Sequence, residues 1–133
     1  MNRPSDGIST STNNYISVGS ILGTAVWQKV NPAGNTEWYI EHQNNSRNAD
    51  AIVEANDNNY MIAGYAETST YDKIFLIKIN EAGGTLWEKR YPGYYGFSLI
   101  KTKDGGFCMA GIANNSSGIM IIKTNSEGET FNP

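Results

Sequence analysis

Short apolar segments alternate with polar turn segments in the middle third of the chain. The apolar segments span 51–55, 60–65, 74–79 and 85–91, and they are rich in β-branched and aromatic residues, as strands of this length are. Asn, Asp and Gly cluster between them, and these residues tolerate the left-handed backbone angles of tight turns. The pattern predicts a four-stranded antiparallel meander.

The same pattern occurs three times along the chain. Asn-Asn-Tyr at 13–15 recurs at 58–60, and Gly-Gly-Phe stands in the third copy at 105–107. The aromatic residue that opens the second strand of each copy therefore recurs after 45 and then 47 residues. A period of this length is typical of propeller blades, which stack because no single unit can bury its own apolar faces.

A second landmark recurs in phase with the first. The motif Lys-x-Asn-x-x-Gly occurs at 29–34, 78–83 and 123–128. An aromatic residue follows each motif, and we expect it to pack between neighbouring repeats; these residues are Trp38, Trp87 and Phe131. Two in-phase landmarks indicate a repeated unit rather than one irregular sheet.

The predicted third strands favour a propeller over an antiparallel sandwich. Segments 74–77 and 119–122 are apolar at successive positions, which predicts that both of their faces are buried. The predicted fold is all-β, a single propeller module over 1–133 with three four-stranded antiparallel blades at about 7–41, 50–91 and 97–132. The twelve strands are expected near 7–11, 15–20, 24–30, 36–41, 51–55, 60–65, 73–79, 85–90, 98–102, 107–112, 118–124 and 129–132.

These motifs resemble the β-propeller repeat of many secreted or surface-associated bacterial and archaeal proteins. The matching segments are 98–107, 110–111, 74–80 and 86–89, and the Asn-x-x-Gly-x-x-x-Trp turn resembles a relaxed tryptophan-docking motif of quinoprotein propellers. The resemblance implies blades whose strands run from axis to rim, and a secreted or cell-surface location. The first copy departs most, since its third strand at 25–28 matches poorly. The family has no single activity, so the resemblance carries a scaffold and no function.

Charge and composition exclude several classes of function. The formal charge of -3 leaves no basic field for a nucleic acid. The single cysteine, Cys108, rules out a disulfide within the chain. No apolar run is long enough to span a membrane, and residues 1–7 contain no signal-peptide core.

The titratable residues form no catalytic or metal-binding pattern. His42 is the only histidine, and we interpret it as a solvated loop residue, because a metal site needs several such ligands. Cys108 aligns with Ile16 and Met61, which predicts a buried, inert thiol. Turns at 57–59 and 104–106 lack the ligand series of a calcium loop. We therefore expect no enzyme activity, no metal and no cofactor.

Aromatic residues near the predicted connections offer a candidate ligand-binding surface. The connections between copies and the loops after each second strand open on the same face of a propeller. Rings there would stack on sugars or peptides while amides and guanidinium groups supply directed hydrogen bonds, although the rings could also serve only to cap the hydrophobic interior. The candidate residues are Tyr39, His42, Arg47, Tyr71, Arg90, Tyr91, Tyr94 and Tyr95.

The function expected from the sequence is a non-catalytic scaffold that binds a protein or a carbohydrate. The alternative is a fragment of a larger propeller enzyme whose catalytic residues lie outside this chain. Three blades are too few to close a ring, since propellers have about 4 to 8. We therefore expect a homodimer that closes a six-bladed ring head to tail; a longer chain or a separate partner that supplies further blades is the alternative.

Overall fold

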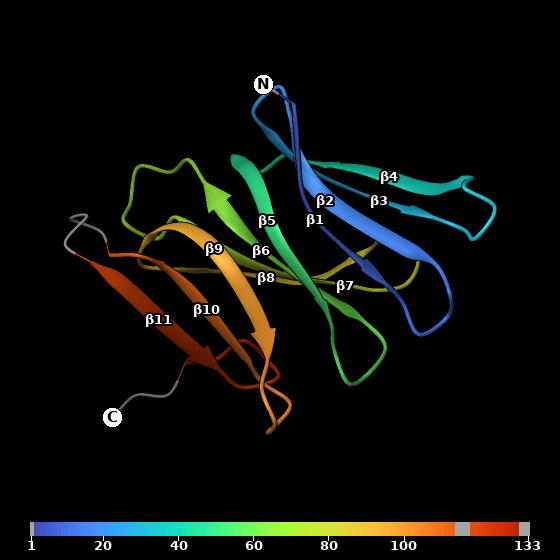
Figure 1. The fold of residues 1–133 in the computed structure, drawn as a ribbon. Coiled ribbons are helices and arrows are strands. Elements are labelled where there is room, and N and C mark those ends of the chain that lie inside the picture. Colours follow the sequence, from blue (N-terminus) through green and yellow to red (C-terminus); the bar gives the residue numbers. More distant parts are fainter. Residues whose placement is uncertain (1, 114–117, 131–133) are drawn as a thin grey trace.

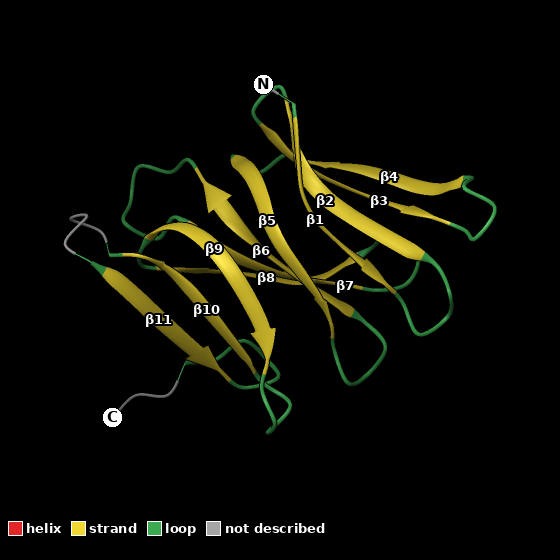
Figure 2. Ribbon diagram, in the orientation of Figure 1, coloured by secondary structure: helices red, strands yellow, loops and turns green. Residues whose placement is uncertain are grey.

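Three antiparallel β-sheets follow one another along the chain in a computed structural model, which describes residues 2–113 and 118–130 (Figure 1). No helix occurs in those residues (Figure 2). Sheet 1 comprises β1 (Arg3–Ser9), β2 (Tyr15–Ile21), β3 (Thr24–Val30) and β4 (Thr36–His42). Sheet 2 comprises β5 (Ser46–Glu54), β6 (Tyr60–Ala66), β7 (Ile74–Ile79) and β8 (Thr85–Tyr91). Sheet 3 comprises β9 (Tyr94–Lys101), β10 (Phe107–Ile112) and β11 (Ile119–Thr124).

The predicted meander order is confirmed in all three sheets, and β3 forms although its sequence matches the repeat poorly. Of the predicted strand at 129–132, the described part forms one antiparallel bridge between Thr124 and Thr130; the rest lies outside the described residues. The first strand of each sheet begins four or five residues earlier than predicted, at Arg3, Ser46 and Tyr94. Those early residues are polar or bulged, so they lack the alternation that predicts a strand.

A β-bulge in each first strand lies opposite a glycine of the second strand. The register shifts between Ala49 and Ala51, opposite Gly64, and equivalent irregularities occur opposite Gly19 and Gly111. A Cβ added at any of these glycines would overlap a backbone carbonyl oxygen of the bulged strand. The repeated glycine is therefore required by close backbone approach, as is common at bulges.

Two hydrophobic layers hold the sheets together, and sheet 2 lies between them. One layer joins sheets 1 and 2 and includes Trp27 and Phe75, and the other joins sheets 2 and 3 and includes Leu76 and Met109. Every residue of β6 and β7 is buried. The prediction that the third strand of the middle repeat is buried on both faces is confirmed.

The corresponding prediction for 119–122 is wrong for this chain. Ile122 is buried against sheet 2, whereas Ile119 and Ile121 are 84% and 71% exposed. Alternate side chains of a strand point to opposite faces, and no described residue covers the outer face of sheet 3. Burial of both faces needs a sheet on each side, and sheet 3 has a neighbour on one side only.

Each tryptophan of the repeat packs onto the turn of the following sheet, as predicted. A Cβ added at Gly83 would lie 3.0 Å from the Trp38 ring, and one at Gly128 would lie 2.7 Å from the Trp87 ring. The Trp38 indole also donates to the Glu81 carbonyl at 2.9 Å. Phe131, the third expected aromatic, lies outside the described residues. The tryptophans therefore join neighbouring sheets.

Candidate functional site

Four connections between strands lie together at one edge of the molecule, which we call the loop edge (residues 22–23, 43–45, 67–73 and 92–93). The Glu67 amide donates to the Asn45 carbonyl at 2.8 Å, and the Gly93 amide donates to the Tyr71 carbonyl at 3.0 Å. Arg47, at the start of β5, donates to the Gly23 carbonyl at 3.3 Å. These bonds join connections from all three sheets into one surface.

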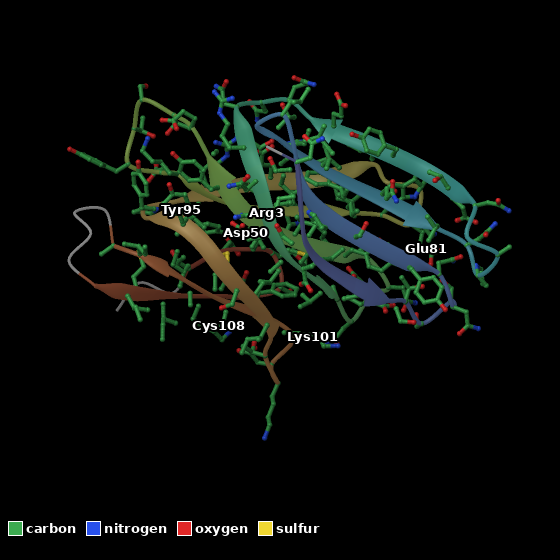
Figure 3. The ribbon with its side chains drawn as sticks, turned by 45° about the horizontal axis from the view of Figure 1, so that its top comes forward. Arg3, Asp50, Glu81, Tyr95, Lys101 and Cys108 are labelled. Carbon is green, nitrogen blue, oxygen red and sulfur yellow. The ribbon has the colours of Figure 1, made fainter. Side chains whose placement is uncertain are left out.

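Three tyrosines form a cluster where sheets 2 and 3 meet this edge. The ring centroids of Tyr65 and Tyr95 are 4.7 Å apart, and those of Tyr94 and Tyr95 are 4.9 Å apart. The Lys73 ammonium lies 5.7 Å from the Tyr94 ring centroid, within the range of a cation–π contact. Figure 3 shows Tyr95 at the end of β9 that adjoins the loop edge. The cluster presents aromatic and cationic groups together.

The geometry of the cluster is set by a bulge and a buried phenol. Tyr95 has a φ of 58°, the left-handed region that is uncommon for non-glycine residues. Tyr65 is buried and donates to the Glu67 carboxylate at 2.7 Å. Burial and this acceptor raise the pKa of Tyr65, so its phenol remains a neutral donor. Glu67 thus holds the Tyr65 hydroxyl, and the Tyr65 ring packs against both tyrosines of β9.

His42 and Arg90 come together through a residue that the sequence did not single out, Glu88. The Glu88 carboxylate lies 2.9 Å from His42 Nε2 and 2.6 Å from Arg90 Nη2. Burial alone would raise the pKa of Glu88, but hydrogen bonds from His42, Arg90 and Asn44 outweigh it and lower the pKa to about 2. Trp27 stacks on the His42 ring at 5.1 Å. The Glu88 carboxylate thus has hydrogen-bond donors from three residues, and the network joins sheet 1 to sheet 2.

The interpretation of His42 as a solvated loop residue is therefore wrong. Strand β4 extends to His42, and the imidazole is largely buried between Trp27 and Glu88. No sequence pattern marked this extension, because β4 carries Glu, Tyr and His, which also suit a loop. The connection to sheet 2 is only three residues long.

The side chains of two further candidate residues do not contribute to the loop edge. Tyr39 is in the middle of β4, half-exposed on the outer face of sheet 1, and its hydroxyl donates to Glu41 at 3.1 Å. Tyr91 is buried in β8, and it donates to the Gly128 carbonyl at 2.6 Å. Burial raises the pKa of Tyr91. Tyr91 thus has a structural role between sheets 2 and 3, and the loop edge retains Arg47, Tyr71, Tyr94 and Tyr95 among the candidates.

Sequence reasoning missed Tyr65, Glu67 and Lys73, which complete the cluster. Tyr65 follows the bulge-facing glycine of β6, where the other copies have Ser20 and Ile112. This aromatic substitution within the repeat was the available sequence signal. Glu67 and Lys73 carried none, because charged residues in a loop are ordinary.

Cys108 and the acidic turns are structural in this chain. Cys108 is only half-buried, on the outer face of sheet 3, whereas the sequence predicted a buried thiol. Asp57 and Asp104 each pair with a lysine, Lys78 at 2.6 Å and Lys123 at 3.0 Å. Within the described residues there is no group of three or more His, Cys, Asp or Glu side chains that could hold a metal ion. The same residues include no helix that could span a membrane.

Asp50 has a buried carboxyl oxygen without a hydrogen-bond partner at the bulge of β5. Its carboxylate lies 3.5 Å from the Arg3 guanidinium, while its Oδ2 atom is buried and has no hydrogen-bond partner among the described residues. Figure 3 labels Arg3 and Asp50 near each other. Burial raises the pKa of Asp50 to about 6, and Arg3 offsets only part of this effect. The ionised form is therefore disfavoured in the folded state.

We expect Asp50→Asn to stabilise the protein in a pH-dependent manner. The pKa of Asp50 in the folded state is raised above its ordinary value of 3.8. The contribution of protonated Asp50 to the stability of the parent is therefore fully present below pH 4 and is lost as the pH rises through 6. After allowance for screening by solvent, the variant should gain about 2 kcal/mol over the parent between pH 4 and pH 7.5. Urea unfolding at both pH values measures this, and a difference that does not change with pH would contradict it.

Comparisons with known proteins support the fold and identify no activity. No family model and no curated protein matches the chain. A crystal structure of a protein of unknown function from Bacteroides caccae is similar over 98% of this chain, with a TM-score of 0.66 at 11% identity. This chain covers 45% of that protein, so it spans less than half of its length. At this identity the likeness establishes a shared arrangement of sheets.

Proposed function

We propose that this chain is a non-catalytic β-propeller module that binds a carbohydrate or a protein at its loop edge. The observation that carries the proposal is the tyrosine cluster, in which Tyr94 and Tyr95 stand beside Tyr65 and Lys73 at the meeting point of two sheets. Clusters of partly exposed rings at joined loops are typical of binding surfaces.

The arrangement of the sheets supports a propeller. The first strands lie beside one another, with β5 against both β1 and β9 (Figure 1). The tryptophan contact and the bulge opposite glycine recur from sheet to sheet. Such repeated contacts between successive antiparallel sheets are what radial stacking around an axis requires.

The chemistry of the loop edge favours a neutral, hydroxyl-rich ligand over a charged peptide. Lys73 already pairs with Glu67 at 3.5 Å, and Arg90 already pairs with Glu88. The groups that can contact a ligand are the faces of the aromatic rings, above all that of Tyr71, which is 73% exposed. The hydroxyls of Thr68 and Thr70 lie in the same loop. Sugars offer an apolar face for such rings and hydroxyls for such partners. A secreted or cell-surface location would give access to these ligands.

A fragment of a larger propeller enzyme is the second candidate. The similar solved structure is more than twice as long as the part that this chain matches, which favours additional blades in relatives of this fold. In that case the catalytic residues would lie in blades outside this chain, and the loop edge would contribute only to binding.

We expect Tyr71→Ala and Tyr94→Ala each to weaken ligand binding about tenfold, the value of one lost ring contact. A glycan array identifies the ligand, and isothermal titration calorimetry measures the dissociation constants. Tyr39→Ala is the matched control, because Tyr39 is half-exposed in sheet 1 and lies away from the loop edge. If Tyr39→Ala weakened ligand binding as much as the other two variants do, the binding site would not be at the loop edge. If the chain bound displayed peptides and no glycan, the ligand would be a peptide.

A further inference from the structure

Each sheet has two faces, and corresponding faces of the three sheets carry equivalent positions of the repeat. We call the face toward the next sheet the leading face and the face toward the preceding sheet the trailing face. Within the chain, the leading faces of sheets 1 and 2 pack on the trailing faces of sheets 2 and 3. The leading face of sheet 3 and the trailing face of sheet 1 have no partner among the described residues.

The leading face of sheet 3 is built like one that packs against another sheet. Ile119 and Ile121 occupy the repeat positions of Ile74 and Leu76, which are fully buried beneath sheet 3. Ile100, on β9 of the same sheet, is also among the exposed large hydrophobic residues. Exposed β-branched side chains in a row on a sheet face are unusual for a face that meets only water.

The trailing face of sheet 1 lacks the matching contacts. Tyr15 is 49% exposed, whereas Tyr60 and Phe107 at the equivalent positions are buried. A Cβ added at Gly34 would meet nothing within 4 Å, whereas Gly83 and Gly128 are each covered by the tryptophan of the preceding sheet. The turn at Gly34 is therefore an uncovered docking position of the same kind.

We propose that the leading face of sheet 3 packs on the trailing face of sheet 1 in a second copy of this chain. At both contacts within the chain, a leading face packs on a trailing face. The leading face of sheet 3 therefore fits a trailing face, and among the described residues sheet 1 has the trailing face that no sheet covers. Two copies placed head to tail make two such contacts and close a ring of six sheets. The inference rests on the proposed propeller but not on the proposed ligand.

The trailing face of sheet 1 has room for the projecting isoleucines. Two hollows of about 220 and 340 Å³ lie side by side on it and share Ser17 and Gln28 in their walls. Ser17 stands where the other sheets have Ile62 and Met109, so a smaller side chain leaves space at the centre of the face. Projecting branched residues on one face and hollows on the other are complementary in shape.

The oligomeric mass of the 133-residue chain tests the proposal. Sedimentation equilibrium between about 1 and 100 μM should give a mass near twice 14.6 kDa at the upper concentrations. A monomer throughout the range would overturn the proposal. A mass that keeps rising beyond two copies would overturn the closed ring, because a head-to-tail contact that fails to close forms filaments.

Two variants test which faces meet. Ile121→Lys on the leading face and Ser17→Arg on the trailing face should each raise the dimer dissociation constant at least about 30-fold, as loss of a central interface contact does. Both side chains are exposed in the single chain, and circular dichroism checks that both variants fold. Leu22→Lys is the matched control, because Leu22 is 81% exposed in the β2–β3 turn, off both faces, and should leave the dimer unchanged. A dimer that survives Ser17→Arg but not Ile121→Lys would overturn the head-to-tail arrangement in favour of sheet 3 against sheet 3.

Mixing the two variants provides a further measurement. Each mixed pair retains one contact between an intact leading face and an intact trailing face, so equimolar Ile121→Lys and Ser17→Arg chains should form dimers that neither forms alone. No recovery would overturn the proposal. Cys108 lies on the leading face, and its reaction with an aromatic disulfide reagent should slow as the parent protein is concentrated. Failure of these tests would leave the effect of Tyr71→Ala on ligand binding unchanged, so the two proposals fail separately.

Discussion

Gly64→Ala is expected to lower the free energy of unfolding by about 3 kcal/mol, at the upper end for overpacking of a core. The added methyl would overlap the Asn48 carbonyl oxygen of the bulge and approach the Phe75 ring to 2.5 Å. Backbone on one side and a buried ring on the other leave no direction in which the site can relax. Urea unfolding followed by circular dichroism measures the change.

Gly7→Ala is the matched control for this substitution. Gly7 lies in the exposed strand β1, and its added Cβ would meet the Ile16 carbonyl oxygen at 3.4 Å, an ordinary contact. We expect a change within about 0.5 kcal/mol, or a small gain from the less flexible unfolded chain. Equal effects of the two substitutions would show that glycine at 64 is not required by the bulge.

Trp87→Ala is expected to destabilise the protein by about 3 kcal/mol. Its ring covers Gly128 and lies beside Tyr91 in the layer between sheets 2 and 3. Truncation of a fully buried tryptophan costs about 3 to 5 kcal/mol, and the partial exposure of Trp87 places it at the lower limit. The same unfolding experiment, with intrinsic fluorescence of the remaining tryptophans, measures it.

Tyr71→Ala serves as the control for loss of an aromatic ring from this fold. Tyr71 is exposed in the β6–β7 loop, so its truncation should change stability by less than about 0.5 kcal/mol. If Trp87→Ala had an equally small effect, the recurring tryptophans would be surface features without a role in joining the sheets.

The candidate site was predictable only in part. Arg47, Tyr71, Tyr94 and Tyr95 lie at the loop edge as expected, because strand ends and turn residues determine which connections share an edge. Tyr39 and Tyr91 do not, because Tyr39 lies in the middle of β4 and the side chain of Tyr91, at the end of β8, is buried between sheets 2 and 3. The residues that complete the cluster and the His42 network each have a partner 21 or more positions away along the chain, and such contacts leave no local pattern.

The sequence by itself determined the order and phase of the strands. Period-2 alternation, turn glycines and two in-phase landmarks are local signals, and they act over a few residues. Even the bulges were marked, since the glycine opposite each of them recurs in every copy.

Only the tertiary structure decided which faces are covered and which charges are satisfied. Burial of a side chain depends on the neighbouring sheet, so Leu76 and Ile121 have equivalent places in the repeat but opposite exposures. Likewise Glu88 and Asp50 are both carboxylates within strands, yet the pKa of one is lowered and that of the other is raised. His42 and Arg3, which contact them, both come from sheet 1, and the distance between sheets is set by packing rather than by any local pattern.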